Sequence, residues 1–302
     1  MGVSLPSYVL ITPARNESAF IEKTILSVIS QTILPLRWVI VSDGSTDGMD
    51  DIVGQYAANH SWIELIRLPE RKERHFAGKV NAFNAGYAAI RELNYEVIGN
   101  LDADITFDEG QYEFLLRKFS ENSSLGVAGP ALREQSSKYD YRFTSIEHVS
   151  GCCQMFRRKC FEDIGGYTAI KMGGIDLVAV MTARMKGWQT RTFPEKTCVH
   201  HREMGTAKQN ALMVALRGGH GDYRLGTHPL WEFLRSFYQG TRRPIVLGAC
   251  FRLAGFTWAL ITGAEKLISP ELVRFRRAEQ MRRLRDFIRS SMPLQKERLR
   301  ST

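Results

Sequence analysis

Residues 38–48 read WVIVSDGSTDG, an apolar, β-branched run that passes directly into acidic residues, hydroxyl residues and glycines. Such a run is typical of a buried strand, and the Asp, Ser and Gly after it are typical of a turn. The same combination of strand and polar cluster recurs at PARNE (13–17) and at LDAD (101–104). Segments with helical periodicity separate the three clusters. This alternation predicts an α/β fold with a mostly parallel central sheet.

The three polar clusters are expected at one edge of this sheet. Doubly wound sheets bind ligands at the carboxyl ends of their strands, and each cluster begins where a strand ends. The predicted strands cover residues 8–12, 38–42, 63–68, 96–101 and 127–131. The predicted helices lie near residues 19–31, 49–59, 79–93 and 109–119. We therefore expect segments far apart in the sequence to form one site.

After residue 150 the pattern becomes more mixed. An apolar stretch, CCQMF (152–156), and a Gly-Gly turn precede a predicted helix over 176–186 and a predicted strand over 189–193. With 302 residues and 44% hydrophobic content, the chain can bury a full core. The expected domains are residues 1–229, in two halves at about 1–131 and 132–229, and a helical, basic extension over 230–302.

Cysteine use and the N-terminus point to a cytoplasmic protein. The five cysteines form no C-x-x-C pair, so neither a disulfide framework nor a zinc site is expected. The first residues, MGVSLPSYVLITPARNE, lack the basic start and the longer apolar run of a secretory signal.

The C-terminal region carries the excess of positive charge. The net charge is +9, and residues 271–302 contain ten Lys or Arg against four acids. Residues 244–264 are almost uncharged and are interrupted only by Arg252. We expect peripheral contact with an anionic membrane through 244–302, in preference to a buried helix, a solvated basic face or a true span. No nucleic-acid partner is expected, because the basic tail contains no recognisable motif.

The chemistry depends first on two carboxylates. Asp102 and Asp104 directly follow an apolar strand, and both can face a cation if the chain bends there. Mg²⁺ or Mn²⁺ held by one or two carboxylates and by diphosphate oxygens is the arrangement expected. Taken alone, the pair is also typical of a turn at the end of a strand.

Asp43 ends the second predicted strand. A carboxylate there can accept hydrogen bonds from a nucleobase N–H group or from a ribose hydroxyl. The alternative is that Asp43, Ser45 and Asp47 only build the loop and cap the next helix.

Together, PARNE, SDGSTD and LDAD resemble the family-2 glycosyltransferases of GT-A fold. The resemblance covers most of residues 8–203 and includes AGKVNAFNAG (77–86) and CCQMFRR followed by IGGY (164–167). It implies a Rossmann-like domain that binds a nucleotide-diphospho-sugar, with the nucleotide-binding half at about 1–131 and the acceptor half at about 132–229. The fold expected is therefore a GT-A α/β domain with a C-terminal helical extension.

The resemblance assigns the donor site to five positions. Pro13, Ala14 and Glu17 would line the nucleotide, and Asp43 would hold the base. Lys79 would lie near the phosphates or the entry loop, although it also fits a surface lysine on an amphipathic helix.

The resemblance also implies a metal site for Mn²⁺ or Mg²⁺. Asp104 would be the principal ligand, and Asp102 would be a further metal residue that also contacts the ribose or sugar side of the donor. FPEKTCVHHRE (193–203) matches the place where the family supplies a histidine. His200, or else His201, would take that role, since successive residues of a strand face opposite ways.

The catalytic base implied by the resemblance is Asp176. It precedes the helical sequence that ends in KGW, and Ile175 stands where the family usually has Glu. An acceptor hydroxyl needs a base to remove its proton during attack. An N-cap for the following helix is a second role that would also explain Asp176.

The function expected is inverting transfer of a sugar to a hydroxyl of a glycan or lipid-linked acceptor, in cell-surface polysaccharide or glycolipid synthesis at the inner face of the cell membrane. Gln-x-x-Arg-Trp, the motif of processive synthases, does not follow the helix, which favours transfer of single sugars. The alternatives are a polyprenyl-phosphate glycosyltransferase, a nucleotidyltransferase and a degenerate nucleotide-sugar-binding protein. The sugar, the base, the acceptor and the oligomeric state are not encoded in any recognisable motif.

Overall fold

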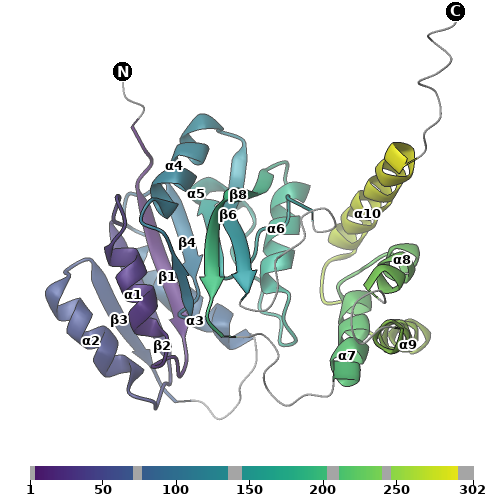
Figure 1. Ribbon diagram of the computed structural model, residues 1–302, viewed down its shortest axis with the longest axis horizontal. Coiled ribbons are helices and arrows are strands. Elements are labelled where there is room, and N and C mark those ends of the chain that lie inside the picture. Colours follow the sequence, from purple (N-terminus) through teal and green to yellow (C-terminus); the bar gives the residue numbers. More distant parts are fainter. Residues whose placement is uncertain (1–3, 71–76, 135–144, 203–210, 240–245, 292–302) are drawn as a thin grey trace, which may run out of the picture. The chain divides into compact units, whose positions relative to one another are not determined.

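The computed structural model describes residues 4–70, 77–134, 145–202, 211–239 and 246–291. The chain divides into two compact units, residues 1–204 and residues 205–302. The first is an α/β unit and the second consists of helices (Figure 1). We refer to them as the α/β unit and the helical unit.

The described strands of the α/β unit form one sheet with the order β3-β2-β1-β4-β7-β6-β8-β5. The strands β1, β2, β3 and β4 are parallel, as are β6 and β8, whereas β7 and β5 pair antiparallel with their neighbours. The strands are β1 (Tyr8–Ala14), β2 (Arg37–Asp43), β3 (Ile63–Leu68), β4 (Val97–Leu101), β5 (Ile105–Phe107), β6 (Leu125–Glu134), β7 (Cys153–Arg157) and β8 (Gln189–His200). The mostly parallel α/β architecture predicted from the sequence is confirmed.

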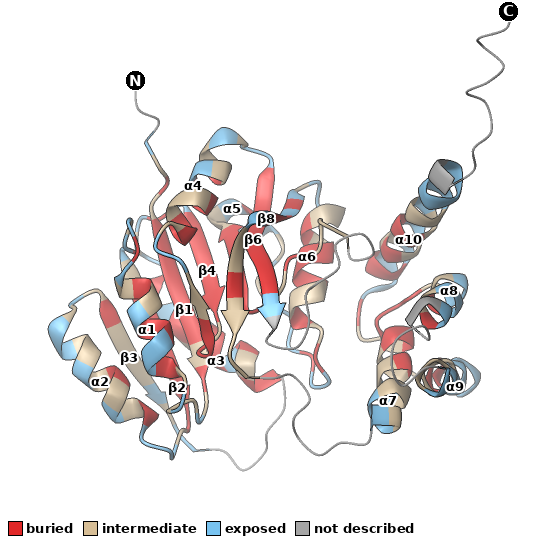
Figure 2. Cartoon of the chain, viewed as in Figure 1, coloured by how far each residue is buried: buried red, intermediate tan, exposed pale blue. Residues whose placement is uncertain are grey.

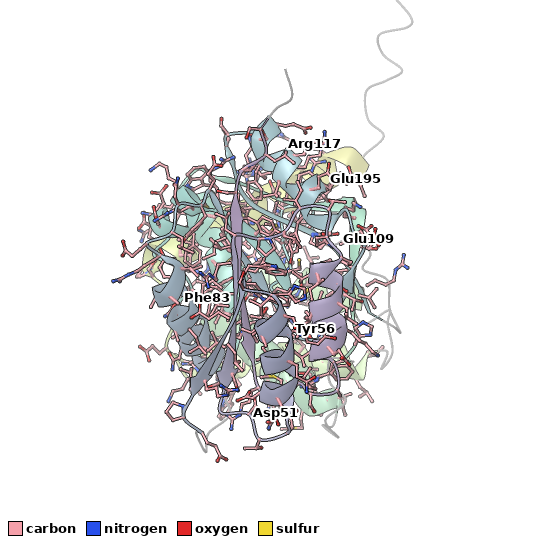
Figure 3. The ribbon with its side chains drawn as sticks, turned by 90° about the vertical axis from the view of Figure 1, so that its left-hand side faces the viewer. Asp51, Tyr56, Phe83, Glu109, Arg117 and Glu195 are labelled. Carbon is pink, nitrogen blue, oxygen red and sulfur yellow. The ribbon has the colours of Figure 1, made fainter. Side chains whose placement is uncertain are left out.

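Helices cover both faces of this sheet. The helices of the α/β unit are α1 (Ile21–Ile29), α2 (Met49–Asn59), α3 (Ala77–Ile90), α4 (Gln111–Glu121), α5 (Arg158–Asp163) and α6 (Ile175–Met185). The chain moves outward from β1 to β3 and then returns to β4, so right-handed crossovers place α1 and α2 on one face and α3 on the other. Figure 3 shows Tyr56 of α2 and Phe83 of α3 on opposite sides of the strands.

The core explains why these segments fold as strands. Residues of β1 and β4 are almost entirely buried, as expected for parallel strands covered on both faces (Figure 2). On the α3 side, Gly86 allows the helix to approach the sheet, because an added Cβ would lie 2.7 Å from the Ile11 side chain. Phe83 packs there with Phe161 and Tyr167 at ring-centroid distances of 5.6 and 4.9 Å.

Three strands differ from the sequence-based expectation. The short β5 was not predicted, and CCQMF was read only as an apolar stretch although Cys153–Arg157 forms β7. The strand expected over 189–193 extends to His200 as β8. A register shift near Pro130 and Ala131 of the neighbouring β6 lets the pairing continue, and the second half of β8 also pairs with β5.

The helical unit contains α7 (Ala211–Arg224), α8 (Pro229–Gln239), α9 (Leu247–Ile261) and α10 (Pro270–Ser291). The expected domain boundary after residue 229 differs from the observed division after residue 204, because α7 packs against α9. A small apolar cluster of Tyr223, Phe256 and Ala259 lies between these two helices. Among the described helices, none combines the length and the apolar character needed to cross a membrane.

Candidate active site

The topology brings two of the polar clusters to one edge of the sheet. The strand order reverses between β1 and β4, and such a switch point leaves a crevice at the carboxyl ends of the strands. PARNE begins in the last residues of β1 and LDAD in the last residue of β4, so both lie at this switch point. SDGSTDG follows β2, which pairs in parallel with β1, where Ala14 lies opposite Ser42. The convergence expected from the sequence therefore follows from strand order.

The first two clusters are joined by hydrogen bonds between their loops. The Thr46 backbone N–H donates to the Asn16 side chain at 2.8 Å, and the Ser18 N–H donates to Asp47 at 2.8 Å. Asn16 has a left-handed backbone with φ 54°, which is uncommon for a residue other than glycine. Asp47 also accepts from the Met49 N–H at the start of α2, at 3.1 Å. Asp47 therefore joins the two loops and accepts a hydrogen bond from the first residue of α2, whereas Gly48 occupies the N-cap of that helix.

Asp43 occupies a different position from these loop residues. It is the last residue of β2 and is buried, with 7% of its surface exposed. Gly44 follows with φ +67° and lies against the backbone of Glu70, so the chain turns away directly after the carboxylate. Pro13 and Ala14 end the neighbouring strand β1. The structure thus places three of the expected donor-site residues on adjacent strand ends.

Asp104 and His200 form a pair at the opposite side of the β4 end. The distance between His200 Nε2 and Asp104 Oδ2 is 3.1 Å, and the antiparallel pairing of Ile105 with His200 fixes this contact. The hydrogen bond to Asp104 raises the pKa of His200, although burial opposes the increase. His200 Nδ1 is buried and has no hydrogen-bond partner among the described residues.

His201 points elsewhere, as the alternation of side chains along a strand predicts. Its Nε2 lies 2.8 Å from Thr106 Oγ1, and its ring stacks on Phe20. Burial and the nearby Lys23 ammonium lower the pKa of His201. Of the two histidines, only His200 contacts the carboxylate of Asp104 in the described structure.

Arg202 is a site residue that the sequence interpretation missed. Its Nη2 lies 2.5 Å from Glu17 Oε2, and its Nε lies 3.9 Å from Asp104 Oδ2. Its guanidinium also lies over the Phe20 ring at 5.7 Å. Arg202 therefore connects the PARNE cluster after β1 with the LDAD cluster after β4. Its position directly after the histidine pair was the one signal in the sequence.

Asp102, directly after β4, and Lys79, in the first turn of α3, form an ion pair. Lys79 Nζ contacts Asp102 Oδ1, so the interpretation of Lys79 as a surface lysine is wrong. Burial alone would lower the pKa of Lys79, but Asp102 and the more distant Asp176 raise it above its ordinary value. The Asp102 backbone is itself fixed, because its N–H donates to the Cys152 carbonyl at 2.8 Å.

Asp176 is connected to the same strand end through Gly151. The Gly151 N–H donates to Asp176 Oδ2 at 3.2 Å, and the Asn100 side chain donates to the Gly151 carbonyl at 2.5 Å. Asn100 lies on β4, directly before LDAD. Gly151 is required in this position, because an added Cβ would lie 2.7 Å from Asp176 Cβ.

The interpretation of Asp176 as the N-cap of its helix is wrong. Gly174 occupies the N-cap of α6 with φ 84°, and Asp176 lies in the first turn with its carboxylate directed at Gly151. Ile175, where the resemblance expects Glu, is buried with 7% exposure. Asp176 is thus the acidic residue in the first turn of α6.

The residues present fit a divalent metal with few protein ligands. No group of three or more His, Cys, Asp or Glu side chains within the described residues could enclose an ion by itself. Asp104 and His200, however, lie 3.1 Å apart, and two adjacent ligands of an octahedral ion at about 2.1 Å are separated by about 3 Å. Mg²⁺ and related ions commonly bind through one or two side chains and substrate phosphates. Asp102 Oδ1 is instead paired with Lys79.

Comparison with known proteins relates the strands β1 to β6 and the three strand-end clusters to a family. Residues 9–148 match the family described as Glycosyl transferase family 2. Residues 9–148 are therefore similar to a family-2 glycosyltransferase domain. The resemblance inferred from PARNE, SDGSTD and LDAD is confirmed.

Relatives of this family-2 domain include poly-beta-1,6-N-acetyl-D-glucosamine synthases. That of Staphylococcus epidermidis is 26% identical over 204 residues, which cover 61% of this chain and 47% of the relative. That of Staphylococcus aureus strain COL is 24% identical over the same length. The chain spans about half the length of the curated relatives that it matches.

Solved structures confirm that the family-2 domain has the GT-A fold. The mannosyltransferase PcManGT from Pyrobaculum calidifontis, in complex with GDP-Man and Mn²⁺, matches with a TM-score of 0.54 and 20% identity, over 94% of this chain and 81% of that chain. S. aureus TarS 1–349 in complex with UDP matches with a TM-score of 0.55 and 13% identity, over 85% of this chain and 91% of that chain. At these identities the likeness establishes the fold.

Proposed function

We propose that this chain is an inverting glycosyltransferase that moves a sugar from a nucleotide-diphospho-sugar to a hydroxyl of a glycan or lipid-linked acceptor. One observation carries the proposal. The candidate base Asp176 and the candidate metal ligand Asp104 are both held at the end of β4, Asp104 directly and Asp176 through Gly151 and Asn100. A displacement reaction needs a base and a site for the leaving group in one fixed arrangement.

The donor would bind at the ends of β1 and β2. Asp43 would accept hydrogen bonds from the base or the ribose, while Pro13 and Ala14 would line the nucleotide. Glu17 would act in part through Arg202, since their 2.5 Å ion pair places the guanidinium next to Asp104. Lys79 would hold Asp102 in position toward the ribose or sugar.

The residues Asp104 and His200 would hold Mn²⁺ or Mg²⁺ when it is bound. The solved relative PcManGT contains Mn²⁺ and GDP-Man, and the 3.1 Å pair in this chain suits such an ion. The ion would supply Lewis-acid stabilisation for the negative charge that develops on the leaving diphosphate. His200 must be unprotonated at Nε2 to serve as a ligand.

Asp176 would take the proton of the acceptor hydroxyl as that oxygen attacks the sugar. Its carboxylate is fixed by the Gly151 N–H, which limits its rotation without removing its charge. Attack from the side opposite the diphosphate gives inversion at the anomeric carbon. Removal of the proton during attack distinguishes this reaction from transfer to a polyprenyl phosphate, whose acceptor oxygen is already ionised.

The names of the relatives support the proposed class of acceptor. Poly-beta-1,6-N-acetyl-D-glucosamine synthases make a polysaccharide, and this supports a role in cell-surface polysaccharide or glycolipid synthesis. Transfer of a single sugar remains our prediction, on the absence of Gln-x-x-Arg-Trp after α6. A cytoplasmic site at the inner face of the membrane also remains a prediction.

Release of nucleoside diphosphate tests this function directly. The full chain would be incubated with a panel of nucleotide sugars and Mn²⁺ or Mg²⁺, with EDTA as the metal-free comparison. We expect turnover of one donor that EDTA and Asp104→Asn abolish. Asp108→Asn is the matched control, because Asp108 is an exposed partner of Lys196 with the same charge. If the chain binds a nucleotide tightly but releases no nucleoside diphosphate with any acceptor preparation added, the result would instead support a degenerate binding protein.

A further inference from the structure

More large apolar side chains are exposed on the described part of the helical unit than on that of the α/β unit. Among the described residues, the α/β unit exposes only Leu26, Leu34, Leu36 and Met172 of this kind. Most of the others lie on α8 and α9 or beside them. Contiguous exposed apolar surface on a water-soluble domain marks an interaction site.

Helix α8 has its apolar face outward and its polar face inward. Glu232 and Ser236, one turn apart, have 0% exposure. The exposed residues follow the i, i+3, i+4, i+7 spacing that normally faces a core. They are Leu230, Phe233, Leu234 and Phe237, with exposures between 40% and 62%.

Helix α9 is inverted in the same way. Arg252 points inward and pairs with Glu232 at 2.8 Å and with Asp222. The outward residues recur at i, i+3, i+7, i+11 and i+14, which is one face of a helix. They are Leu247, Cys250, Ala254, Trp258 and Ile261, all of them exposed.

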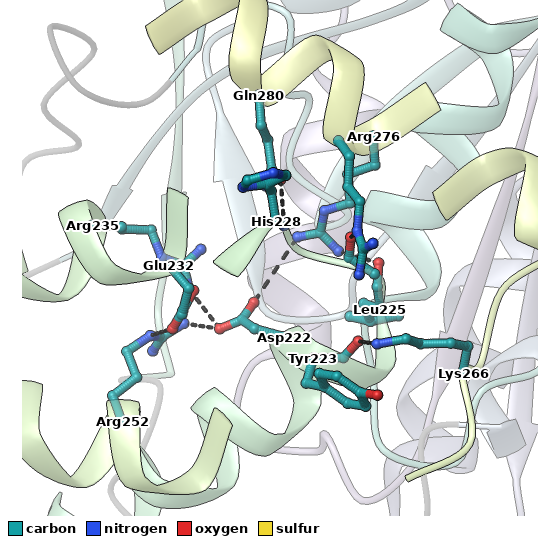
Figure 4. Close-up of polar contacts among 12 residues, drawn as sticks. Asp222, Tyr223, Leu225, His228, Glu232, Arg235, Arg252, Lys266, Arg276 and Gln280 are labelled. Carbon is teal, nitrogen blue, oxygen red and sulfur yellow. Dashed lines mark hydrogen bonds and ion pairs between the residues drawn. The ribbon is translucent and has the colours of Figure 1, made fainter. Parts of the chain in front are cut away.

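The interior of this unit contains a network of charged groups in addition to the small apolar cluster (Figure 4). Asp222 on α7 contacts Arg235 of α8, Arg252 of α9 and Arg276 of α10. Arg276 also donates to the Leu225 carbonyl at 2.6 Å and is 5% exposed. Polar groups inside and apolar groups outside are the reverse of the arrangement that water favours.

The contact between α7 and α9 is unusually close. An added Cβ at Gly219 would lie 1.8 Å from the Arg252 carbonyl oxygen, and one at Gly255 would lie 2.0 Å from the Leu216 carbonyl oxygen. Helices that associate in an apolar solvent use small residues in this way, because they gain little from burying apolar side chains against each other. The apolar side chains of α9 are then left on its outer face.

Helix α10 adds a positive stripe to the same unit. Its exposed arginines lie within about 80° of one another around the helix axis. They are Arg274, Arg282, Arg285 and Arg289. Glu271 in the first turn and Asp286 beside the stripe leave an excess of positive charge. Arginine side chains at this density suit the phosphates of anionic lipids.

We propose that the helical unit docks on an anionic lipid bilayer, with the apolar faces of α8 and α9 entering the interface and the arginine stripe of α10 contacting lipid headgroups. The structure extends the membrane contact expected from residues 244–302, since α8 lies before that segment. A second copy of this chain is a poorer partner, because it would bring the same positive charge to the interface.

Flotation of the full chain with vesicles tests the proposal. The vesicles contain phosphatidylcholine, with or without phosphatidylglycerol. We expect binding that phosphatidylglycerol strengthens and that Phe233→Glu with Phe237→Glu lowers about tenfold or more. Trp258→Glu with Ile261→Glu is a second pair on another helix. Arg282→Glu with Arg285→Glu should remove the preference for phosphatidylglycerol.

Leu26→Glu with Leu36→Glu is the matched control, because both residues are about as exposed as Phe233 but lie in the α/β unit. This control should bind vesicles as the unmodified chain does, and circular dichroism should show that every variant is folded. The proposal is overturned if the unmodified chain does not float, or if the α8 and α9 variants float as well as it does. A lipid-free dimer that Phe233→Glu with Phe237→Glu dissociates, without vesicle binding, would show that a second copy covers this face.

Discussion

The two units of this chain place polar and apolar residues in opposite ways. In the α/β unit the apolar strands are buried, and the charged groups gather at the carboxyl ends of the sheet. In the helical unit the charges of Asp222, Glu232 and Arg276 are inside, and large apolar side chains face out. The first arrangement suits a site for a polar ligand in water, and the second suits a boundary with lipid.

This contrast predicts that catalysis depends on the α/β unit and that membrane binding depends on the helical unit. If it is correct, changes at the strand ends alter turnover without altering membrane binding. Changes in the helical unit alter its stability or its membrane binding and leave the donor site intact. The following predictions test the separation, beginning with the largest expected effect.

Asp176→Asn should lower the rate of sugar transfer about 10³-fold, because a positioned general base typically contributes 10²- to 10⁴-fold. The substitution keeps the shape of the side chain and removes its basicity. Single-turnover transfer to an acceptor hydroxyl measures the effect, with donor affinity and vesicle flotation unchanged. A loss of less than tenfold would indicate an acceptor that is already ionised, such as a lipid phosphate.

Arg252→Met should destabilise the helical unit by about 3 to 5 kcal/mol, because it leaves Asp222 and Glu232 buried without one of their cations. Hydrogen exchange resolved by peptide measures this loss separately in the two units. Arg67→Met is the matched change in the α/β unit, where Arg67 forms an exposed ion pair with Asp50 at 3.1 Å. That control should cost about 1 kcal/mol or less. Equal losses of stability in the two variants would contradict the proposed difference between the two units.

The stability of the helical unit should fall as the pH rises from about 4.5 to about 7. Burial raises the pKa of Glu232 from 4.5 to about 7. The Arg235 guanidinium opposes this increase, and the Asp222 carboxylate adds to it. The folded state therefore favours the protonated form of Glu232. This contribution to stability is complete below pH 4.5, the pKa in the unfolded chain, and is lost as the pH rises through about 7, the pKa in the folded chain. The change is roughly 3 kcal/mol at most. Hydrogen exchange at several pH values measures it, and Glu232→Gln should flatten the profile.

Gly151→Ala should lower transfer about tenfold to hundredfold through the position of Asp176. The new methyl group would lie 2.7 Å from Asp176 Cβ, and a small displacement of a reacting group is costly. The maximal rate should fall while the KM for the donor stays near its original value. Gly54→Ala is the matched control, because an added Cβ there meets nothing within 4 Å. Equal rates in the two variants would show that Asp176 does not need this support.

Much of the α/β unit could be predicted from the periodicity of apolar residues and from the residues typical of turns. The apolar runs that became β1 to β4 contain β-branched residues and are followed by polar residues or proline. The short β5 could not be predicted, because three residues are too few to show an alternation of apolar and polar side chains. This strand depends on its pairing with β8. The N-cap role expected for Asp176 failed for a related reason, since Gly174 supplies the turn.

The sequence by itself determined the resemblance to a family, the order of β1 to β4 and of the helices between them, and the residue types at the strand ends, because these depend on local pattern and on motifs within short segments. Only the tertiary structure decided that His200 rather than His201 contacts Asp104, that Arg202 joins Glu17 to Asp104, and that Lys79 pairs with Asp102. These contacts join segments far apart in the chain. The same holds for the inverted helices, since a helical pattern shows that two faces differ but not which of them is turned inward.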